Sequence, residues 1–491
     1  MLGVVAVLVL TDRPGDVSNP DVAFETTPPE APPTPKPRPT SSKDPFDDGF
    51  EWPVYGLTKS RTRYLPLDRP LRPPFVRRWQ LSGSILLEFP PVLCGKQLFL
   101  LKNNGALYGV SRQTGKVKWK RKLGYLAAAS PACSHGTVYA TFLEKRKGTR
   151  QGRVVAVRAR DGFVRWRRDL PSRSETSPLI DRGRLYLGSE NGTIYALRAK
   201  DGAVRWTYDA GGAVKGALAL DNGKLFFGDY DGQVSAIRRA DGKRLWEVSG
   251  AGRGIRGQGN FYATPAVAYG RVYIGSTDGF VYSFSTRDGK LAWRHKTGGY
   301  VYSSPAVSPV LGGTVFAGSY DGKLYAFDAR TGKVRWTRKS GGKISGGPQV
   351  IGDLVFYSNL SRRSTGAVGA ATGKPVWSIG RGAFNPVISD GRRLYLVGYS
   401  SMYMLTEQGV GTDGKVTAKE RRARSRAARI RAINRRIAAR RARVHRILER
   451  RRRGIKVCFE SGGKKTCRLP RPPVCFERKS DGRVVCRARK P

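Results

Sequence analysis

The sequence predicts an all-β fold, an eight-bladed β-propeller, and two observations carry this prediction. The pattern Gly-x-x-x-Trp recurs seven times, and its tryptophans lie 40 to 47 residues apart. Asn-Gly and Asp-Gly pairs separate short runs of alternating polar and apolar residues, which is typical of tight hairpins because both central turn positions take positive φ. Three such turns in each period of about 43 residues indicate a four-stranded antiparallel blade.

The number of blades follows from the periods. Seven complete periods end at tryptophans, and an eighth begins near residue 383 but stops near residue 408 without its own Trp strand. An isolated strand around Trp79 supplies what is missing, so we expect the N-terminal strand to complete the last blade and close the ring. A large flat side chain at one place in each blade suits packing between blades better than ligand stacking. The eight structural tryptophans are Trp79, Trp119, Trp166, Trp206, Trp246, Trp293, Trp336 and Trp377.

Composition divides the chain into five segments. Residues 1–10 are apolar and uncharged, about half of the ~20 residues a spanning helix needs, and they lack a basic start. We interpret them as a truncated membrane anchor; the alternative is a flexible apolar terminus without such a role. Residues 11–50 form a Pro-rich linker, expected to be an extended spacer. Then come the propeller (51–408), an Arg-rich helix (409–454) and a basic Cys-containing tail (455–491). This order predicts an extracytoplasmic, membrane-anchored cell-envelope protein.

Positive charge dominates the sequence. Lys and Arg number 90 against 37 Asp and Glu, a formal net charge of +53, which favours an anionic partner. Residues 419–453 combine dense Arg with apolar residues at heptad-like spacing, which predicts a long helix with a narrow apolar stripe. We expect this helix to bind an anionic polymer or an anionic membrane surface; nucleic acid is a less favoured partner, and a solvated tail without a fixed partner is the alternative. The candidate anion-binding residues are Arg421, Arg422, Arg435, Arg436, Arg440, Arg441, Arg450 and Arg451.

The six cysteines form an even set without a CxxC spacing, which fits disulfides in an oxidising compartment. The tail contains a duplicated unit that begins Val-Cys-Phe-Glu and ends Cys-Arg, and each copy is typical of a small stapled hairpin. A zinc site made of the four tail thiolates is the alternative, although their spacing is wide for it. The expected pairs are Cys458–Cys467 and Cys475–Cys486 in the tail and, as a further hypothesis, Cys94–Cys133 in successive blades.

Repeats such as GKLYAFDARTGKVRW and GTIYALRAKDGAVRW resemble the pyrroloquinoline-quinone (PQQ) type of propeller repeat. That resemblance covers residues 50–408 and implies eight blades with a tryptophan-docking motif. The segment WPVYGLTKSRTRYLPL (52–67) resembles the lead-in of quinoprotein dehydrogenases; we expect Trp52 to belong to a plug that packs on the propeller. The repeat is specific for the fold, whereas one fold hosts many activities.

The quinoprotein resemblance implies a quinone on the propeller axis beneath a disulfide between adjacent cysteines, a calcium ion and an Asp base. No two cysteines are adjacent here, and Glu175 is the only acidic residue in the segments that should start the inner strands. Calcium needs several oxygen ligands, usually more than one carboxylate. The surroundings of Arg253 and Arg256 predict a basic funnel. No P-loop, HExxH or GxSxG motif is present either. We therefore predict no catalytic residues, no metal and no cofactor.

The body is similar to the non-enzymatic BamB-type branch of this family, and the basic tail departs from it. The prediction is a monomeric, non-enzymatic envelope scaffold that binds envelope proteins through its propeller loops and anionic partners through residues 419–453. Two alternatives remain open: a PQQ-dependent oxidoreductase, for which PQQ would be the cofactor, and a nucleic-acid-binding protein.

Overall fold

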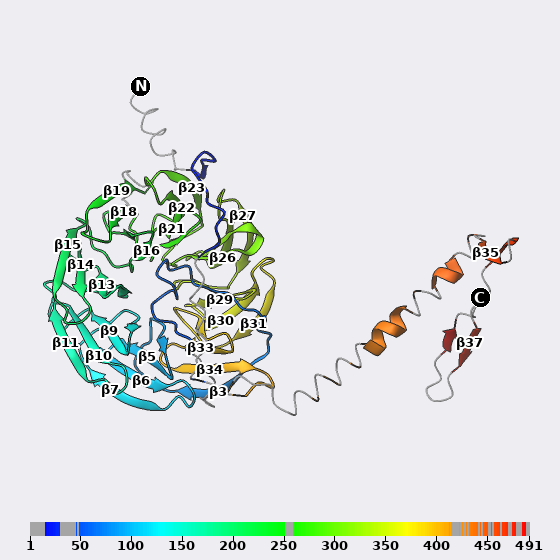
Figure 1. The fold of residues 1–491 in the computed structure, drawn as a ribbon, viewed down its shortest axis with the longest axis horizontal. Coiled ribbons are helices and arrows are strands. Elements are labelled where there is room, and N and C mark those ends of the chain that lie inside the picture. Colours follow the sequence, from blue (N-terminus) through cyan, green and yellow to red (C-terminus); the bar gives the residue numbers. More distant parts are fainter. Residues whose placement is uncertain are drawn as a thin grey trace, which may run out of the picture. The chain divides into compact units, whose positions relative to one another are not determined.

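A computed structural model describes residues 15–29, 46, 49–250, 259–411 and 413, and within the C-terminal unit residues 422, 425, 429, 432–439, 442, 445–449, 453, 456–461, 464–469, 474–477 and 484–487. Two compact units divide the chain, residues 1–414 and 415–491. Eight sheets of the first unit stand around a central axis as the blades of a ring (Figure 1).

Each blade is a four-stranded antiparallel meander whose first strand is innermost. The bounds are: blade 1, β4 (Val92–Cys94), β5 (Gln97–Lys102), β6 (Ala106–Ser111), β7 (Val117–Lys122); blade 2, β8 (Ala132–Ser134), β9 (Thr137–Phe142), β10 (Arg153–Arg158), β11 (Val164–Asp169); blade 3, β12 (Leu179–Asp181), β13 (Arg184–Leu187), β14 (Thr193–Arg198), β15 (Val204–Asp209); blade 4, β16 (Ala219–Asp221), β17 (Lys224–Gly228), β18 (Gln233–Arg238), β19 (Arg244–Ser249); blade 5, β20 (Ala266–Ala268), β21 (Arg271–Gly275), β22 (Phe280–Ser285), β23 (Leu291–Lys296); blade 6, β24 (Ala306–Ser308), β25 (Thr314–Gly318), β26 (Lys323–Asp328), β27 (Val334–Lys339), with a short 3-10 helix η1 (Val310–Gly312); blade 7, β28 (Gln349–Ile351), β29 (Leu354–Asn359), β30 (Ser364–Gly369), β31 (Pro375–Ile379); blade 8, β32 (Val387–Ser389), β33 (Arg393–Val397), β34 (Met402–Glu407).

The N-terminal strand closes the ring, which confirms the predicted eight blades. Strand β3 (Phe75–Leu81) pairs antiparallel with β34, so the fourth strand of blade 8 comes from the start of the propeller. Because β3 precedes blade 1 in the chain and completes the sheet of blade 8, its hydrogen bonds to β34 hold the two ends of the ring together.

A fully buried charge cluster lies at the seam between blade 8 and blade 1, where the ring closes. Asp390 of blade 8 accepts hydrogen bonds from Arg112 of blade 1 (2.7 Å) and from Arg393 (2.8 Å) and Tyr395 (3.0 Å) of its own blade. Burial alone would raise the pKa of Asp390, but the two guanidinium groups outweigh burial and hold it at about 2. Phe46 covers the cluster, with the Arg393 guanidinium 3.8 Å from its ring centre.

The tryptophans share one packing arrangement. In every blade a β-bulge directly precedes the Trp on the outer strand. Small residues such as Ala196 stand opposite the indole in most blades, and the ring packs on the turn Gly of the next blade; a Cβ on Gly202 would lie 2.7 Å from Trp166. Six indoles also donate to a carbonyl of the next blade: Trp79 to Arg112, Trp119 to Ala159, Trp166 to Ala199, Trp246 to Thr286, Trp293 to Ala329 and Trp336 to Ala370. These contacts connect each tryptophan to the neighbouring blade.

Part of the expected spacer is packed on the propeller. Strand β1 (Val17–Ser18) adds antiparallel to β23 at the outer edge of blade 5 (Figure 1). Asp16 contacts His295 at 2.9 Å. Phe24 stacks on Tyr269 with ring centres 5.0 Å apart. Residues 15–29 are therefore not a free spacer, because strand pairing and an aromatic contact hold them on blade 5. Residues 1–10 lie outside the described residues, as do 30–45 of the Pro-rich stretch.

In the C-terminal unit the described residues at 432–439 and 445–449 are helical. Two hairpins follow, β35 (Val457–Ser461) with β36 (Lys464–Arg468), and β37 (Val474–Glu477) with β38 (Val484–Arg487). Disulfides join Cys458 to Cys467 and, in the propeller, Cys94 to Cys133, which match two of the expected pairs. Cys475 stands opposite Cys486 in its hairpin, and their side chains lie outside the described residues. Across the part of the chain that is described, no helix has the length and apolar character to cross a membrane.

Candidate functional site

A segment from the N-terminal side of the propeller occupies the central channel. Residues 52–65, here called the plug, run past the innermost strands of successive blades, and β2 (Tyr64–Leu65) pairs parallel with β28. The carbonyls of plug residues accept backbone N–H groups from four consecutive inner strands at 2.8–2.9 Å: Lys59 from Leu220, Ser60 from Val267, Thr62 from Val307 and Arg63 from Val350. Inner strands normally leave one edge unpaired at a propeller axis, and the plug satisfies these edges.

Local backbone geometry allows this path. Leu57, Arg61 and Arg63 all have positive φ (74°, 60° and 56°), which is costly for residues with a side chain and persists only where surrounding contacts enforce it. Arg61 is completely buried and donates to the carbonyls of Leu218 (2.9 Å) and Tyr55. Burial, with help from the nearby charge of Arg63, lowers the Arg61 pKa to about 9. The plug is thus anchored by its side chains as well as by its backbone.

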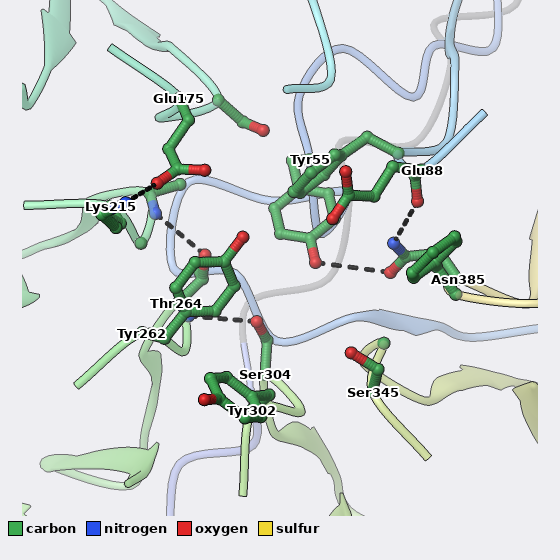
Figure 2. A pocket seen from close by; sticks show the side chains of 16 residues that line it. Tyr55, Glu88, Glu175, Lys215, Tyr262, Thr264, Tyr302, Ser304, Ser345 and Asn385 are labelled. Atoms are coloured by element: carbon green, nitrogen blue, oxygen red, sulfur yellow. Dashed lines mark hydrogen bonds and ion pairs between the residues drawn. The ribbon is translucent and has the colours of Figure 1, made fainter. Parts of the chain in front are cut away.

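Above the plug a small pocket lies at one mouth of the channel (Figure 2). Its walls come from the loops that lead into the inner strands, and Tyr55 of the plug borders it. The Tyr55 hydroxyl and Asn385 Oδ1 lie 3.4 Å apart, and the Asn385 amide donates to the Glu88 carbonyl (2.9 Å). Neighbouring lead-in loops are tied together by hydroxyl groups; Thr264 N donates to Ser304 Oγ at 3.0 Å. The pocket encloses about 40 Å³, room for a few water molecules.

Two carboxylates line the pocket, and burial raises the pKa of both. Burial raises the pKa of Glu88 to about 7, and the negative charge of Glu175 adds to this effect. Glu175 forms an ion pair with Lys215 at 2.7 Å, and Lys215 also contacts Glu190 at 2.9 Å. Burial alone would lower the Lys215 pKa, but attraction to both carboxylates raises it above its usual value. The charge of Glu175 is therefore already compensated from within the protein.

An arc of tyrosines borders the same mouth, from the loops of blades 4, 5 and 6. Ring centres are 6.4 Å apart for Tyr230 and Tyr262, 5.5 Å for Tyr262 and Tyr302, 5.0 Å for Tyr302 and Tyr320, and 6.1 Å for Tyr300 and Tyr302. Tyr300 is 54% exposed, whereas Tyr262 and Tyr302 also line the pocket. Below, "tyrosine arc" means these five residues. Such an arc offers partly exposed ring faces and hydroxyl groups to a partner.

The sequence-predicted site residues are separated in the structure. Glu175 lies in the pocket, while Arg253 and Arg256 lie outside the described residues. Among the candidate anion-binding residues, Arg422, Arg435 and Arg436 are helical and exposed, and the other five lie outside the described side chains. Sequence reasoning missed Glu88 and the tyrosine arc. The sequence held part of the signal, because Tyr262 and Tyr302 both lie two residues before the Thr-Pro or Ser-Pro pair that leads into an inner strand.

The residues at the mouth do not fit a quinone with a bound calcium ion. Pockets for ligands of that size usually measure ~300 Å³ or more, several times the volume found here. The described residues contain no group of three or more His, Cys, Asp or Glu side chains that could hold a metal. Burial raises the pKa of both carboxylates, which disfavours their charged forms, and Glu175 is also engaged by Lys215.

Comparison with known structures finds the same fold. BamB from Moraxella catarrhalis is 18% identical and aligns with a TM-score of 0.55, covering 68% of this chain and 98% of that chain. Quinohemoprotein alcohol dehydrogenase from Comamonas testosteroni is 14% identical, with a TM-score of 0.60 and coverages of 75% and 81%. A europium-containing methanol dehydrogenase is 15% identical, with a TM-score of 0.58 and coverages of 75% and 91%. No curated protein matches the sequence.

A family model gives a more specific result than these fold similarities. The model described as outer membrane protein assembly factor BamB matches residues 150–259 and 254–427. The matched region exceeds half of the chain and covers blades 3 to 7, the two outer strands of blade 2 and the three strands β32 to β34 of blade 8. On this match, the chain belongs to the BamB family of PQQ-like propellers.

Proposed function

We propose that this chain is a non-enzymatic binding scaffold of the cell envelope. Its propeller presents loops to partner proteins around the channel mouth, and its basic C-terminal arm binds an anionic polymer or an anionic membrane surface. Membership of the BamB family supports protein binding at the envelope. The observation that carries the proposal is the plug, because a channel filled by residues 52–65 leaves about 40 Å³ where a related dehydrogenase would need a cofactor chamber.

The tyrosine arc is the partner-binding surface that we favour. Aromatic side chains are enriched where protein interfaces gain their binding energy, since they bury much area and lose little entropy. Tyr300 stands exposed at the arc, and Lys343 lies 5.3 Å above the Tyr320 ring, so the surface combines aromatic faces with positive charge.

The arm has the character of an amphipathic basic element. Ile433 and Ile437 lie one turn apart and are 48% and 45% exposed, on a helical stretch that also carries Arg435 and Arg436. An exposed apolar stripe flanked by arginines suits the interface of an anionic membrane, and the arginines alone suit a polyanion. The proposed N-terminal anchor would hold the protein at the same surface.

Titration of the full chain with PQQ and calcium tests the non-enzymatic part. We expect no stoichiometric quinone binding and no dye reduction with alcohols or sugars. Stoichiometric binding with substrate-dependent dye reduction would overturn the proposal in favour of a PQQ-dependent oxidoreductase.

A photo-crosslinking residue at position 300 tests the partner surface. Position 163 is the matched control, because Phe163 is a similarly exposed aromatic residue (61%) on a different part of the ring. We expect saturable crosslinks to envelope proteins from position 300 that unlabelled protein competes away. Equal crosslinking from both positions would contradict a role of the tyrosine arc.

A further inference from the structure

The outer strand of blade 1 carries an uncompensated run of positive charge. Strand β7 (Val117–Lys122) has four cations, Lys118, Lys120, Arg121 and Lys122, all exposed, and no acidic residue. Among the described residues no carboxylate lies within ion-pair distance of any of the four. The outer strands of blades 3 and 4 are balanced instead, each with one Arg and one acidic residue.

The protection of edge strands against pairing does not explain why β7 carries more positive charge than other outer strands. Lysines on an exposed edge prevent pairing with another sheet, and among the described residues only blade 5 has a further strand on its outer edge. Strand β31 of blade 7 nevertheless has no charged residue at all. Strand β7 has the most cations of the outer strands, ahead of the three on β27 of blade 6. On the two blades beside blade 1, Arg77 and Arg78 of β3 and Arg165 and Arg167 of β11 add to β7.

The β7 edge is continuous with a basic groove between blades 1 and 2. This groove has a volume of about 440 Å³ and is lined by Lys96, Arg158, Arg160 and Arg165, among others. Arg121 of β7 reaches it by donating to the Asp161 carbonyl at 3.1 Å. Asp161 pairs with Arg158 at 2.6 Å and with Arg160 at 3.5 Å, so it offsets part of the positive charge of the groove. The groove and β7 together are called the basic rim below.

Like charges also crowd one another beside β7, at the buried Lys102 of β5. The Lys102 and Lys120 ammonium groups lie 5.2 and 5.4 Å from the centre of the same Tyr108 ring. Burial lowers the pKa of Lys102, and the charge of Lys120 lowers it further. An anion bound at this place would relieve that repulsion, which is a physical reason for affinity in addition to the number of cations.

We infer that the basic rim is a second anion-binding site, on the propeller itself, for a linear polyol-phosphate chain. Guanidinium groups match phosphate oxygens with paired hydrogen bonds, and lysines add point charges. The six residues of β7 extend over ~20 Å, so the rim fits successive phosphates of a chain better than one small anion. The basic rim shares no residue with the arm or with the tyrosine arc, so a failure of this inference would leave the proposed scaffold role unchanged.

The test uses the full chain and a synthetic glycerol-phosphate oligomer as the probe. The rim variant is Lys118→Glu/Arg121→Glu/Arg165→Glu. The matched control is Arg205→Glu/Arg287→Glu/Lys290→Glu, which makes the same change in net charge at exposed positions on blades 3 and 5. Both variants retain the basic arm, so its contribution is the same in each. Affinity is measured between 50 and 300 mM salt, and melting temperatures verify that both variants fold.

We expect the rim variant to bind at least tenfold more weakly at low salt. Its slope of log affinity against log salt should fall by about 2, since each lost phosphate contact removes ~0.7. The control should keep the wild-type slope. Equal losses in both variants, or no loss in either, would overturn the site. Binding of an oligothymidylate of equal charge, without binding of the glycerol-phosphate oligomer, would overturn the assignment of the polymer class.

Discussion

Asp390→Asn should destabilise the propeller at the seam where the ring closes. In the native protein the carboxylate is fully buried and accepts from Arg112 of blade 1 and Arg393 of blade 8. The neutral amide keeps the shape of the side chain but leaves two buried guanidinium groups without a countercharge. Removal of one partner from a buried ion pair typically costs ~3–5 kcal/mol.

The shifted pKa of Asp390 gives a second measure of how much its charge stabilises the fold. A fall of the Asp390 pKa from 3.8 to about 2 corresponds to ~2 kcal/mol of stability at neutral pH. The substitution should cost more than this, because the two arginines also lose a hydrogen-bond acceptor. For a propeller of about 360 residues the entropy of unfolding is ~0.8 kcal/mol per kelvin, so the melting temperature should fall by ~4–6 °C.

Differential scanning calorimetry at pH 7 measures this change, with Asp241→Asn as the control. Asp241 also pairs with an arginine, Arg238, but on an exposed turn where solvent screens the charges, so its melting temperature should stay within about 1 °C of wild type. Because the folded pKa is depressed, the stabilisation is complete above pH ~4 and is lost as the pH falls towards 2. The difference between wild type and Asp390→Asn should shrink over that range. An Asp390→Asn protein that melts like wild type at pH 7 would refute the reasoning.

Three further predictions concern other parts of the molecule. Trp166→Phe should cost ~1 kcal/mol more than Trp206→Phe in chemical denaturation, because the Trp166 indole donates to Ala199 whereas the buried Trp206 N–H has no partner; equal costs would contradict the docking role of that bond. Glu88→Gln should gain stability over wild type as the pH rises from 4.5 to 7, because the raised pKa makes ionisation of Glu88 costly in the fold; a difference that is constant with pH in thermal melts would contradict it. Cys94→Ser/Cys133→Ser should lose ~2–4 kcal/mol, since the disulfide closes a loop of 39 residues, and unchanged denaturation under oxidising conditions would argue against this bond.

The repeat made the fold predictable, because each period carries its turns, its Trp and its docking Gly at fixed offsets. The closing strand was predictable for the same reason, since Trp79 continues the period. The plug was anticipated only at Trp52, and its path through the channel was not, because residues 52–65 have no strand pattern and take their conformation from the inner strands. Glu88 was missed because no motif marks it, and its pKa depends on burial by loops of other blades. The docking of residues 15–29 on blade 5 was missed because their composition resembles a linker.

Hydrogen exchange of the full chain tests the central claim, that the plug fills the channel. The amides of Leu220, Val267, Val307 and Val350 donate to plug carbonyls, so they should exchange as slowly as the middle strands of their blades. Exchange of these amides at the rate of exposed turns would contradict the claim, because it would mean that the channel opens and could admit a ligand.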